Sequence, residues 1–301
     1  MIDIKLQSKL QQFKYYRDIQ LWPLSTDFNF DEWINNFDAE EKEIAIRLLD
    51  FFVFFPDKAI NQMLATVIGK CGYYFLKNRG SWSNEEFKTN CWYSFVPGEE
   101  QKPTDSGYIF QRKLRDNIGI PERRIISYND LHNQLSSSYN QNIILVDDFV
   151  GSGHQTCVAW LYNRPSGRTL KELVEDNGHC VVYAPLVANY IGKKAIEQNC
   201  NGLGLVYVHE ILKDSNIFSQ ECPCWDGDED LYKRGVELII RKSLELGIPE
   251  TNGNNVIDIK GYREQGLALA FAHGIPDACP PIFYWETSSW KPLMNRVYQR
   301  P

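Results

Sequence analysis

Two adjacent carboxylates, Asp147 and Asp148, stand shortly before a glycine-containing loop, Gly151-Ser152-Gly153. Paired carboxylates can hold hydroxyl groups or a hard cation such as Mg²⁺, which takes oxygen ligands and keeps several of its waters. Glycine lets backbone N–H groups come close to an anion, because it has no side chain in the way. The stretch therefore combines groups that suit a hydroxylated or cationic ligand with groups that suit an anionic one.

The flanking residues place this chemistry between a strand and a helix. The apolar run Ile143 to Val146 is rich in β-branched residues, as expected of a strand buried on both faces, and the acidic pair is predicted to end it. From His154 onward the pattern predicts a helix. Ligands of open α/β sheets bind at the carboxyl ends of strands, where a helix N-terminus adds partial positive charge.

The run from Ile143 to Gly153 resembles the phosphoribosyl pyrophosphate (PRPP) motif of type I phosphoribosyltransferases, which is four apolar residues, an acidic pair, two mostly apolar residues and a small Gly/Ser/Thr-rich loop. In that family the loop wraps the 5′-phosphate. The resemblance thus implies phosphate contacts from Gly151, Ser152, Gly153, His154, Gln155 and Thr156. Many members carry Thr or Ser at the position of His154, and Thr156 is the candidate to supply that hydroxyl.

The residue types suit transfer at the anomeric carbon of ribose, which passes through a cation-like sugar, as glycoside cleavage does. Carboxylates beside the 2′- and 3′-hydroxyls can hold those groups and stabilise the developing positive charge. We therefore assign the catalytic and metal-binding roles to Asp147 and Asp148. The expected cofactor is Mg²⁺, and the expected ligand is PRPP or a nucleotide.

Two other interpretations of the same stretch stay open. Ser152 and Gln155 have the spacing of a capping box, and an acidic pair before a helix can simply complement the helix dipole. The glycines also approximate a dinucleotide fingerprint. That fingerprint needs an acid at the end of the next strand, whereas the run Cys180 to Ala184 is followed by Pro185.

A second group of candidates follows an earlier predicted strand, Thr89 to Val96, which ends at Pro97-Gly98. In type I phosphoribosyltransferases the loop after the first core strand contacts pyrophosphate. That comparison makes Ser106, Gly107 and Arg112 candidates. The alternative is an ordinary helix N-cap followed by solvated arginines.

His209 and Glu210 are predicted to follow a strand, Gly204 to Val208, on the same edge as the acidic pair, where either side chain could act as a base, contact ribose or only cap a turn. Cys222 and Cys224 form the only tight cysteine pair. With His209 upstream the pair could recruit zinc, but its spacing matches no standard site, which favours loop thiols.

Buried strands alternate with helices after about residue 80, which predicts a doubly wound, mainly parallel α/β sheet of the type I phosphoribosyltransferase kind. Residues 1–80 are predicted to form a helical N-terminal cap, including a core helix over Ile44 to Phe55, and residues 81–301 the α/β domain. A short strand is predicted over Arg123 to Ser127. The tail is predicted to hold a hairpin-like pair, Leu267 to Phe271 and Pro281 to Trp285.

A second resemblance covers the tail. Gly266 to Trp285, followed by Trp290-Lys291-Pro292-Leu293 and Arg296, is similar to a phosphoribosyltransferase-like family linked to bacterial conflict systems. Together with the helical front and the central motif, this resemblance extends over most of the chain. It implies an anti-phage effector or regulator with a protein partner.

Composition gives no indication of a nucleic-acid or membrane partner, although a local basic patch stays possible. The net charge of −7 gives no general basic field for nucleic acid or for an anionic membrane. The first residues lack the basic start and apolar core of a signal peptide, and the most apolar segment is too short to span a bilayer. Eight scattered cysteines favour reduced thiols and a cytoplasmic location.

The sequence thus predicts a phosphoribosyltransferase-like protein that binds Mg²⁺ with PRPP or a nucleotide and acts at the ribose anomeric carbon. The alternative is a catalytically silent nucleotide-sensing or scaffold module that regulates a partner protein. A third hypothesis is a toxin that consumes nucleotides.

Overall fold

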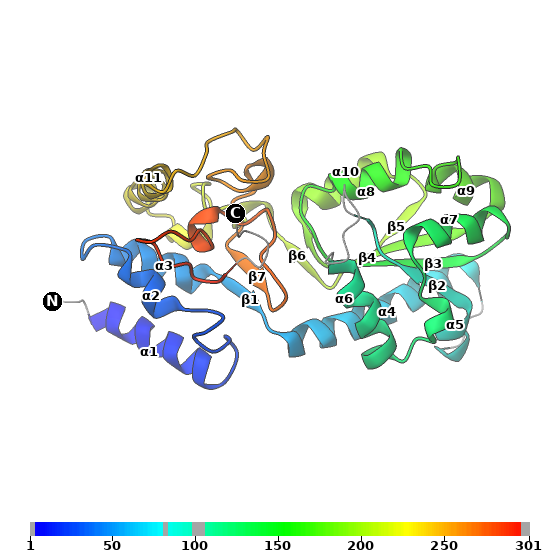
Figure 1. The fold of residues 1–301 in the computed structure, drawn as a ribbon, viewed down its shortest axis with the longest axis horizontal. Coiled ribbons are helices and arrows are strands. Elements are labelled where there is room, and N and C mark those ends of the chain that lie inside the picture. The colour runs from blue at the N-terminus through cyan, green and yellow to red at the C-terminus, as the bar shows by residue number, and fades with distance from the viewer. Residues whose placement is uncertain (1–3, 81–83, 98–105, 296–301) are drawn as a thin grey trace. The chain divides into compact units, whose positions relative to one another are not determined.

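The structure is a computed structural model that describes residues 4–80, 84–97 and 106–295. Its internal contacts divide into two compact units (Figure 1). Unit 1 joins Met1–Asp57 to Lys213–Pro301, and unit 2 is the continuous stretch Lys58–Leu212. This grouping differs from the boundary expected near residue 80, because α4 (Asp57–Arg79) packs with unit 2. The Tyr74 ring lies against Gly204, a strand residue where an added Cβ would stand 2.6 Å from it, and the Arg79 guanidinium donates to the carbonyl of Gly178.

The sheet of unit 2 has the order β2-β3-β4-β5, and every pairing in it is parallel. Its strands are β2 (Cys91–Ser94), β3 (Asn142–Val150), β4 (Cys180–Asn189) and β5 (Leu203–Leu205). A further short strand, β6 (His209–Ile211), pairs with the far end of β4. This topology confirms the predicted α/β fold with a mainly parallel sheet.

Helices cover both faces of this sheet. In Figure 1, α8 (His154–Leu161), α9 (Leu170–Asn177) and α10 (Tyr190–Asn199) lie on one side, and α4, α5 (Asn84–Asn90) and α6 (Ser106–Lys113) lie on the other. The helix α7 (Tyr128–Ser136) packs on the side of α9. Side chains of a strand alternate between faces, so Ile143 and Leu145 share a buried cluster with α7 to α10.

Three local predictions in unit 2 are corrected. Arg123 to Ser127 is not a strand: Glu122–Arg124 is a 3₁₀ turn after a π-helical turn (Leu114–Ile118), and Ile125 makes one isolated parallel bridge to Tyr93. The strand expected over Gly204 to Val208 ends at Leu205, and His209 and Glu210, expected to follow it, lie in the separate short strand β6. The strand expected to stop before Pro185 continues to Asn189.

Unit 1 is built on aromatic packing. Its helices are α1 (Ile4–Asp18), α2 (Phe30–Asn35), α3 (Lys42–Phe51) and α11 (Glu229–Glu245). Trp33 stacks on Phe283 with ring centroids 5.4 Å apart, and its indole N–H donates to the carbonyl of Ile282 at 2.9 Å. Each buried aromatic pair contributes about 1 kcal/mol to stability beyond the hydrophobic gain from its burial, and such pairs stabilise a unit that contains little β-sheet.

A two-stranded parallel sheet joins the two segments of unit 1. The strand β1 (Val53–Phe55) pairs with β7 (Leu269–Phe271), with Val53 opposite Leu269. Two predictions are therefore wrong: the helix over Ile44 to Phe55 ends at Phe51, and Leu267 to Phe271 pairs with β1 and not with Pro281 to Trp285. The 3₁₀ turns of this unit are Lys213–Ser215, Pro223–Trp225, Tyr262–Glu264 and Pro281–Phe283.

A buried carboxylate organises one loop of unit 1. Asp258 is 1% exposed and accepts hydrogen bonds from the Thr251 N–H (2.6 Å), the Thr251 hydroxyl (2.8 Å), the Gly253 N–H (3.2 Å) and the Lys260 N–H (2.9 Å). Burial by itself raises the pKa of Asp258. The hydrogen bonds outweigh that effect and leave the pKa below its ordinary value.

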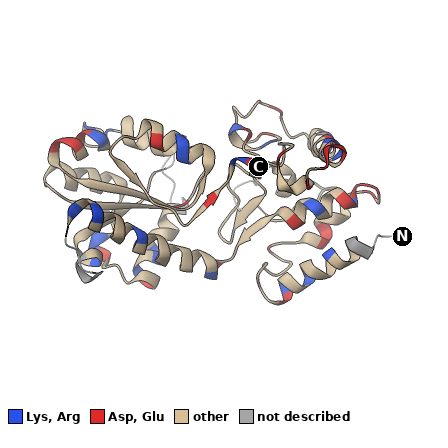
Figure 2. Cartoon of the chain, turned by 180° about the vertical axis from the view of Figure 1, so that it is seen from behind, with Lys and Arg blue, Asp and Glu red and all other residues tan. Residues whose placement is uncertain are grey.

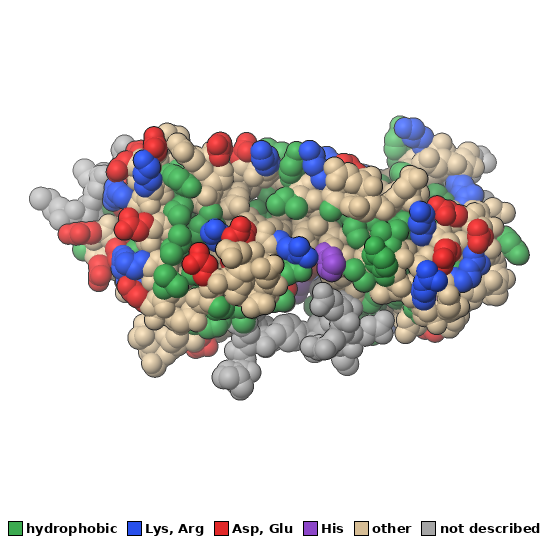
Figure 3. Space-filling model, turned by 90° about the horizontal axis from the view of Figure 1, so that it is seen from above, with side chains coloured by type: hydrophobic (Ala, Val, Ile, Leu, Met, Phe, Trp, Pro, Cys, Tyr) green, Lys and Arg blue, Asp and Glu red, His purple; other side chains and the backbone are tan. Residues whose placement is uncertain are grey.

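Acidic and basic residues are interspersed along the elements of both units (Figure 2) and on the face drawn in Figure 3. The mixture agrees with the modest negative net charge of the chain. In the described ranges no helix combines the length and the apolar character that crossing a bilayer requires. Arg296, the last residue of the second resemblance, lies outside the described residues.

Candidate functional site

The acidic pair lies in the second half of β3. The predicted end of the strand at Asp147 is wrong, because β3 continues to Val150. The parallel register places Asp147 opposite Pro185 and Phe149 opposite Val187. Proline has no N–H, so Pro185 donates no backbone hydrogen bond, yet β4 stays extended through it to Asn189.

The Asp147 carboxylate is held from two sides. The Tyr183 hydroxyl on β4 donates to Oδ2 at 2.8 Å, and the backbone N–H of Asp148 donates to Oδ1 at 3.0 Å. The Tyr183 hydroxyl also hydrogen-bonds with the hydroxyl of Thr156, a residue that is 2% exposed. A chain of hydrogen bonds thus connects β3, β4 and the first turn of α8. The Thr156 hydroxyl has a partner inside the protein, and its contact with phosphate stays a prediction.

Burial raises the pKa of Asp147 well above its ordinary value, and the charge of the neighbouring Asp148 raises it further. The hydrogen bonds from Tyr183 and from the Asp148 N–H offset only part of this effect. Burial also raises the pKa of Tyr183. The half-buried Asp147 carboxylate, which accepts two hydrogen bonds and lies beside a second acid, would gain from a cation or from hydroxyl groups that bring further hydrogen bonds.

The glycine loop turns directly into α8. Gly153 is the N-cap residue and has φ +75°, a left-handed conformation that suits glycine. The capping-box alternative is wrong, because Ser152 is not the N-cap: its Oγ accepts one hydrogen bond from the His154 N–H at 3.3 Å. The N-cap itself makes no side-chain hydrogen bond, so the first turn of α8 keeps N–H groups that an anion can satisfy.

The loop is pressed against the start of α10, which explains its glycines in physical terms. A Cβ on Gly153 would stand 2.8 Å from the carbonyl oxygen of Gly192, and a Cβ on Gly192 would stand 2.4 Å from the carbonyl oxygen of Gly151. Both distances are shorter than normal contacts. The N-terminal turns of α8 and α10 therefore meet at the loop, where their partial positive charges add.

Gln155 ties α8 to the chain that leaves β2. Its side-chain amide donates to the carbonyl oxygens of Val96 at 3.2 Å and Pro97 at 2.9 Å. The first residues after β2 are thus fixed beside the glycine loop. The predicted pyrophosphate loop continues through residues 98–105, which lie outside the described residues.

Ser106, Gly107 and Arg112 lie on α6, and their roles remain predictions. The Ser106 side chain is outside the described residues. Gly107 is required by packing, since a Cβ there would stand 2.1 Å from the Phe95 ring. The Arg112 side chain is 80% exposed and pairs with Asp116 at 3.4 Å.

Glu210 has a partner that lowers its pKa. The Lys193 ammonium on α10 lies 2.9 Å from its carboxylate, and the Tyr207 hydroxyl donates to the same oxygen at 2.8 Å. The hydrogen bond from Lys193, then that from Tyr207, holds the pKa of Glu210 below its ordinary value. Glu210 is thus a poor proton acceptor that fastens β6 to α10. His209 beside it is exposed.

Sequence reasoning missed Tyr183, Gly192 and Lys193. Tyr183 had a detectable signal, because a buried tyrosine in a strand of Val and Ala needs a partner for its hydroxyl. Gly192 and Lys193 gave none, since both depend on how α10 packs. The dinucleotide alternative finds no support in β4, whose last residue is Asn189 and not an acid.

The acidic pair fits Mg²⁺ better than a metal held entirely by protein ligands. In residues 4–80, 84–97 and 106–295, no three His, Cys, Asp or Glu side chains gather so as to hold a metal ion. Mg²⁺ commonly binds through one or two carboxylates, with waters and substrate phosphates completing its shell. Cys222 and Cys224 are buried thiols of unit 1, and burial raises the pKa of Cys222 to about 11.

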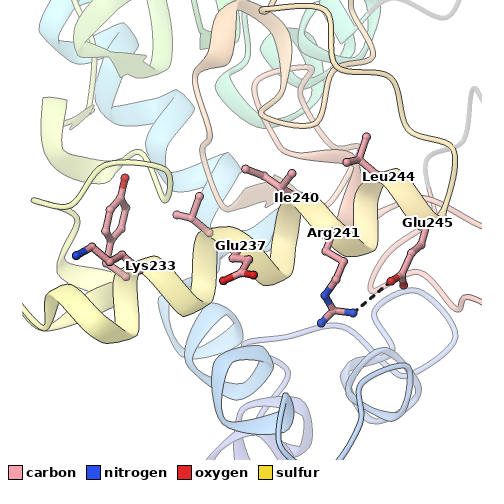
Figure 4. A pocket seen from close by; sticks show the side chains of 8 residues that line it. Lys233, Glu237, Ile240, Arg241, Leu244 and Glu245 are labelled. Carbon is pink, nitrogen blue, oxygen red and sulfur yellow. Dashed lines mark hydrogen bonds and ion pairs between the residues drawn. The ribbon is translucent and has the colours of Figure 1, made fainter.

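A shallow groove of about 630 Å³ runs along α11 in unit 1 (Figure 4). Its lining is an apolar ridge beside a row of charged residues, namely Tyr232, Val236, Ile240 and Leu244 with Lys233, Glu237, Arg241 and Glu245. The charges are partly paired along the helix: Arg241 lies 3.2 Å from Glu245. The lining contains neither an acid pair nor a glycine loop, and the groove is therefore separate from the candidate site.

A family model described as PRTase-CE matches residues 30–296, a range that contains every candidate residue. No curated protein matches the chain.

Proposed function

We propose a function that starts from the family, because the chain belongs to the PRTase-CE family of phosphoribosyltransferase-like proteins. The ligand is PRPP or a nucleotide, bound with Mg²⁺ at the carboxyl edge of β3 and β4. The reaction is displacement at the ribose anomeric carbon. The observation that carries the proposal is the acid pair beside two helix N-termini that meet at Gly151 and Gly153.

Each part of the site has a role in this proposal. Asp147 and Asp148 would hold Mg²⁺ and the ribose hydroxyls, and their negative charge would stabilise a cation-like sugar. When bound, the ion would neutralise pyrophosphate as it leaves. The N–H groups of the loop and of the first turn of α8 would hold the 5′-phosphate. Tyr183 and Gln155 would keep the acid pair and the chain after β2 in place.

Calorimetry with PRPP, with and without MgCl₂, tests the proposal. The double substitution Asp147→Asn/Asp148→Asn should weaken binding by about 100-fold or more, since it removes the charge that holds the ion. The matched control is Glu229→Gln/Asp230→Asn, which removes the same charge from exposed positions on α11. Equal affinity in wild type and the acid-pair variant would reject the assigned site.

A pyrophosphate-release assay with PRPP and a panel of nucleobases tests turnover. The alternative of a silent nucleotide-sensing module rests on His154 and on the internal hydrogen bond of Thr156, which together leave the loop with fewer free hydroxyls. Tight binding of PRPP or a nucleotide without release of pyrophosphate would favour that module.

A role in bacterial defence is the wider biological proposal, and the tail resemblance supports it. Expression of the chain with its neighbouring genes should reduce phage plaque formation. The acid-pair variant should lose that protection, and unchanged protection would dissociate the site from defence. Growth arrest by the chain alone, abolished in the same variant, would identify a nucleotide-consuming toxin.

A further inference from the structure

Two cysteines 43 residues apart in sequence meet in unit 2. Cys157 lies on α8 and Cys200 is the C-cap residue of α10, and their sulfur atoms are 3.5 Å apart. Cys157 is half-buried, so small solutes can reach it, whereas Cys200 is 2% exposed. The pair therefore combines an accessible thiol with a protected one directly behind it.

The chemistry of the two thiols is unequal. The Cys200 thiol donates a hydrogen bond to the Cys157 sulfur, which lowers the pKa of Cys157 to about 7. The lowered pKa favours the Cys157 thiolate, the form that reacts with oxidants. Burial has the opposite effect on Cys71, Cys91 and Cys279, whose pKa values are raised.

We propose that Cys157 and Cys200 form a reversible disulfide when the protein meets a peroxide. The Cys157 thiolate attacks one peroxide oxygen, the O–O bond breaks, and the departing oxygen leaves as hydroxide and takes up a proton to become water. The resulting sulfenic acid is attacked at sulfur by Cys200, which loses its proton as the S–S bond forms and the hydroxyl leaves as a second water. A dithiol reductant reverses the reaction by exchange.

The disulfide would act on the two helices that hold the glycine loop. Bond formation brings the sulfur atoms from 3.5 Å to about 2 Å, and so draws α8 and α10 together. The Gly153 backbone lies so close to α10 that even an added Cβ would stand 3.2 Å from the Cβ of Ala195. A movement of α10 toward α8 would therefore be passed on to the glycine loop. The effect of this shift on phosphate affinity rests on the proposed function, whereas the disulfide does not.

The experiment uses the full chain, reduced and then freed of reductant. Hydrogen peroxide is titrated in, free thiols are alkylated, and peptides are analysed by mass spectrometry without reduction. The expected result is a linked pair of peptides carrying Cys157 and Cys200, together with two fewer alkylated thiols, reversed by dithiothreitol. Cys157→Ser and Cys200→Ser should each abolish the link.

Cys222→Ser/Cys224→Ser is the matched control and should leave the 157–200 link unchanged, because those buried thiols have raised pKa values. Oxidation of Cys157 to sulfinic acid without the link, or a link at an equal rate through another cysteine, would overturn the proposal. Calorimetry with PRPP and Mg²⁺ on the oxidised and reduced forms is a separate readout. If the link forms and PRPP affinity is unchanged, the disulfide stands and its coupling to the loop is rejected. If neither form binds PRPP, only the proposed function fails.

Discussion

Asp258 in unit 1 is fully buried and Asp147 in unit 2 is half-buried, and the hydrogen bonds around their carboxylates differ. Asp258 accepts four, from Thr251, Gly253 and Lys260, and its pKa lies below the ordinary value. Asp147 accepts one from Tyr183 and one from the next backbone N–H, with the acidic Asp148 beside it, and its pKa is raised.

The difference separates an acid that its own loop satisfies from one to which the proposed function assigns a ligand. The carboxylate of Asp258 is satisfied by its own loop and so holds that loop in one conformation. The carboxylate of Asp147 lacks the donors that its charge requires, and a bound cation or sugar would supply them. Burial alone does not distinguish the two roles; the count and kind of partners do.

The largest effect should follow loss of the structural acid. Asp258→Ala leaves three N–H donors and one hydroxyl without an acceptor, which should lower the free energy of unfolding by about 3 kcal/mol. Urea unfolding measures the change. Asp230→Ala, at an 83% exposed side chain, should change it by less than about 0.5 kcal/mol. If Asp258→Ala lowers the free energy of unfolding no more than Asp230→Ala does, Asp258 does not have the structural role assigned to it.

The glycine loop beside Asp147 provides the next test. Gly153→Ala adds a Cβ at φ +75° and 2.8 Å from the Gly192 carbonyl oxygen, and should destabilise the protein by about 2 kcal/mol. Gly227→Ala is the control, since that glycine has φ +74° with open space around it, and should cost about 1 kcal/mol. Thermal unfolding of both variants isolates the cost of the close approach. Equal losses of stability in the two variants would show that α10 moves to accommodate the added Cβ.

Asp147→Asn should stabilise the protein without ligand by about 1 kcal/mol at neutral pH. The folded-state pKa of Asp147 is raised, so the folded form binds more protons, and its contribution to stability falls as pH rises above the ordinary carboxyl value of 3.8. Asp258 acts in the opposite direction, because its lowered pKa gives stability that is lost as pH falls below 3.8. Unfolding measured from pH 4 to 8 should show a flatter decline with rising pH in Asp147→Asn than in wild type. An unchanged profile would contradict the cost assigned to Asp147.

The smallest expected effect is at Gln155. Gln155→Ala removes two hydrogen bonds to carbonyl oxygens at the partly exposed edge of the site, and should lower stability by about 0.5 kcal/mol. Its effect on PRPP affinity should be larger, because the chain after β2 loses its anchor. Gln134→Ala on α7 is a control at a distance from the loop. If Gln155→Ala binds PRPP with the affinity of wild type, Gln155 contributes to packing only.

Much of the candidate site could be predicted from local sequence. The run Ile143 to Val146 is apolar and β-branched, and the helix after Gly153 follows from its own periodicity. The continuation of β3 through two aspartates could not be predicted that way, because acidic residues have low strand propensity and pairing with β4 overrides it. The contact of Gly192 with the loop could not be predicted from the sequence either, since a single glycine in a helix gives no signal of what packs against it.

Long-range pairings limited the prediction of the fold. Val53 to Phe55 continues the apolar pattern of a helix, and only its partner β7 makes it a strand. Residues Leu267 to Phe271 and Pro281 to Trp285 have the composition of a hairpin. Instead, Leu269 to Phe271 pairs in parallel with β1, and Phe283 stacks on Trp33 within a turn. Both partners are distant in sequence. Such partners decide the structure where local preference is weak.

The pairing of β1 with β7 has a consequence for synthesis on the ribosome. Unit 2 is continuous in the chain and can collapse as soon as Leu212 has emerged, whereas the first 57 residues lack the strand that completes their sheet. At about 5–20 residues per second, translation of the roughly 200 residues between the partners takes on the order of 10 to 40 seconds. During that interval the aromatic surfaces of the nascent N-terminal segment are without their C-terminal cover. A chaperone that shields exposed rings therefore has its greatest opportunity there.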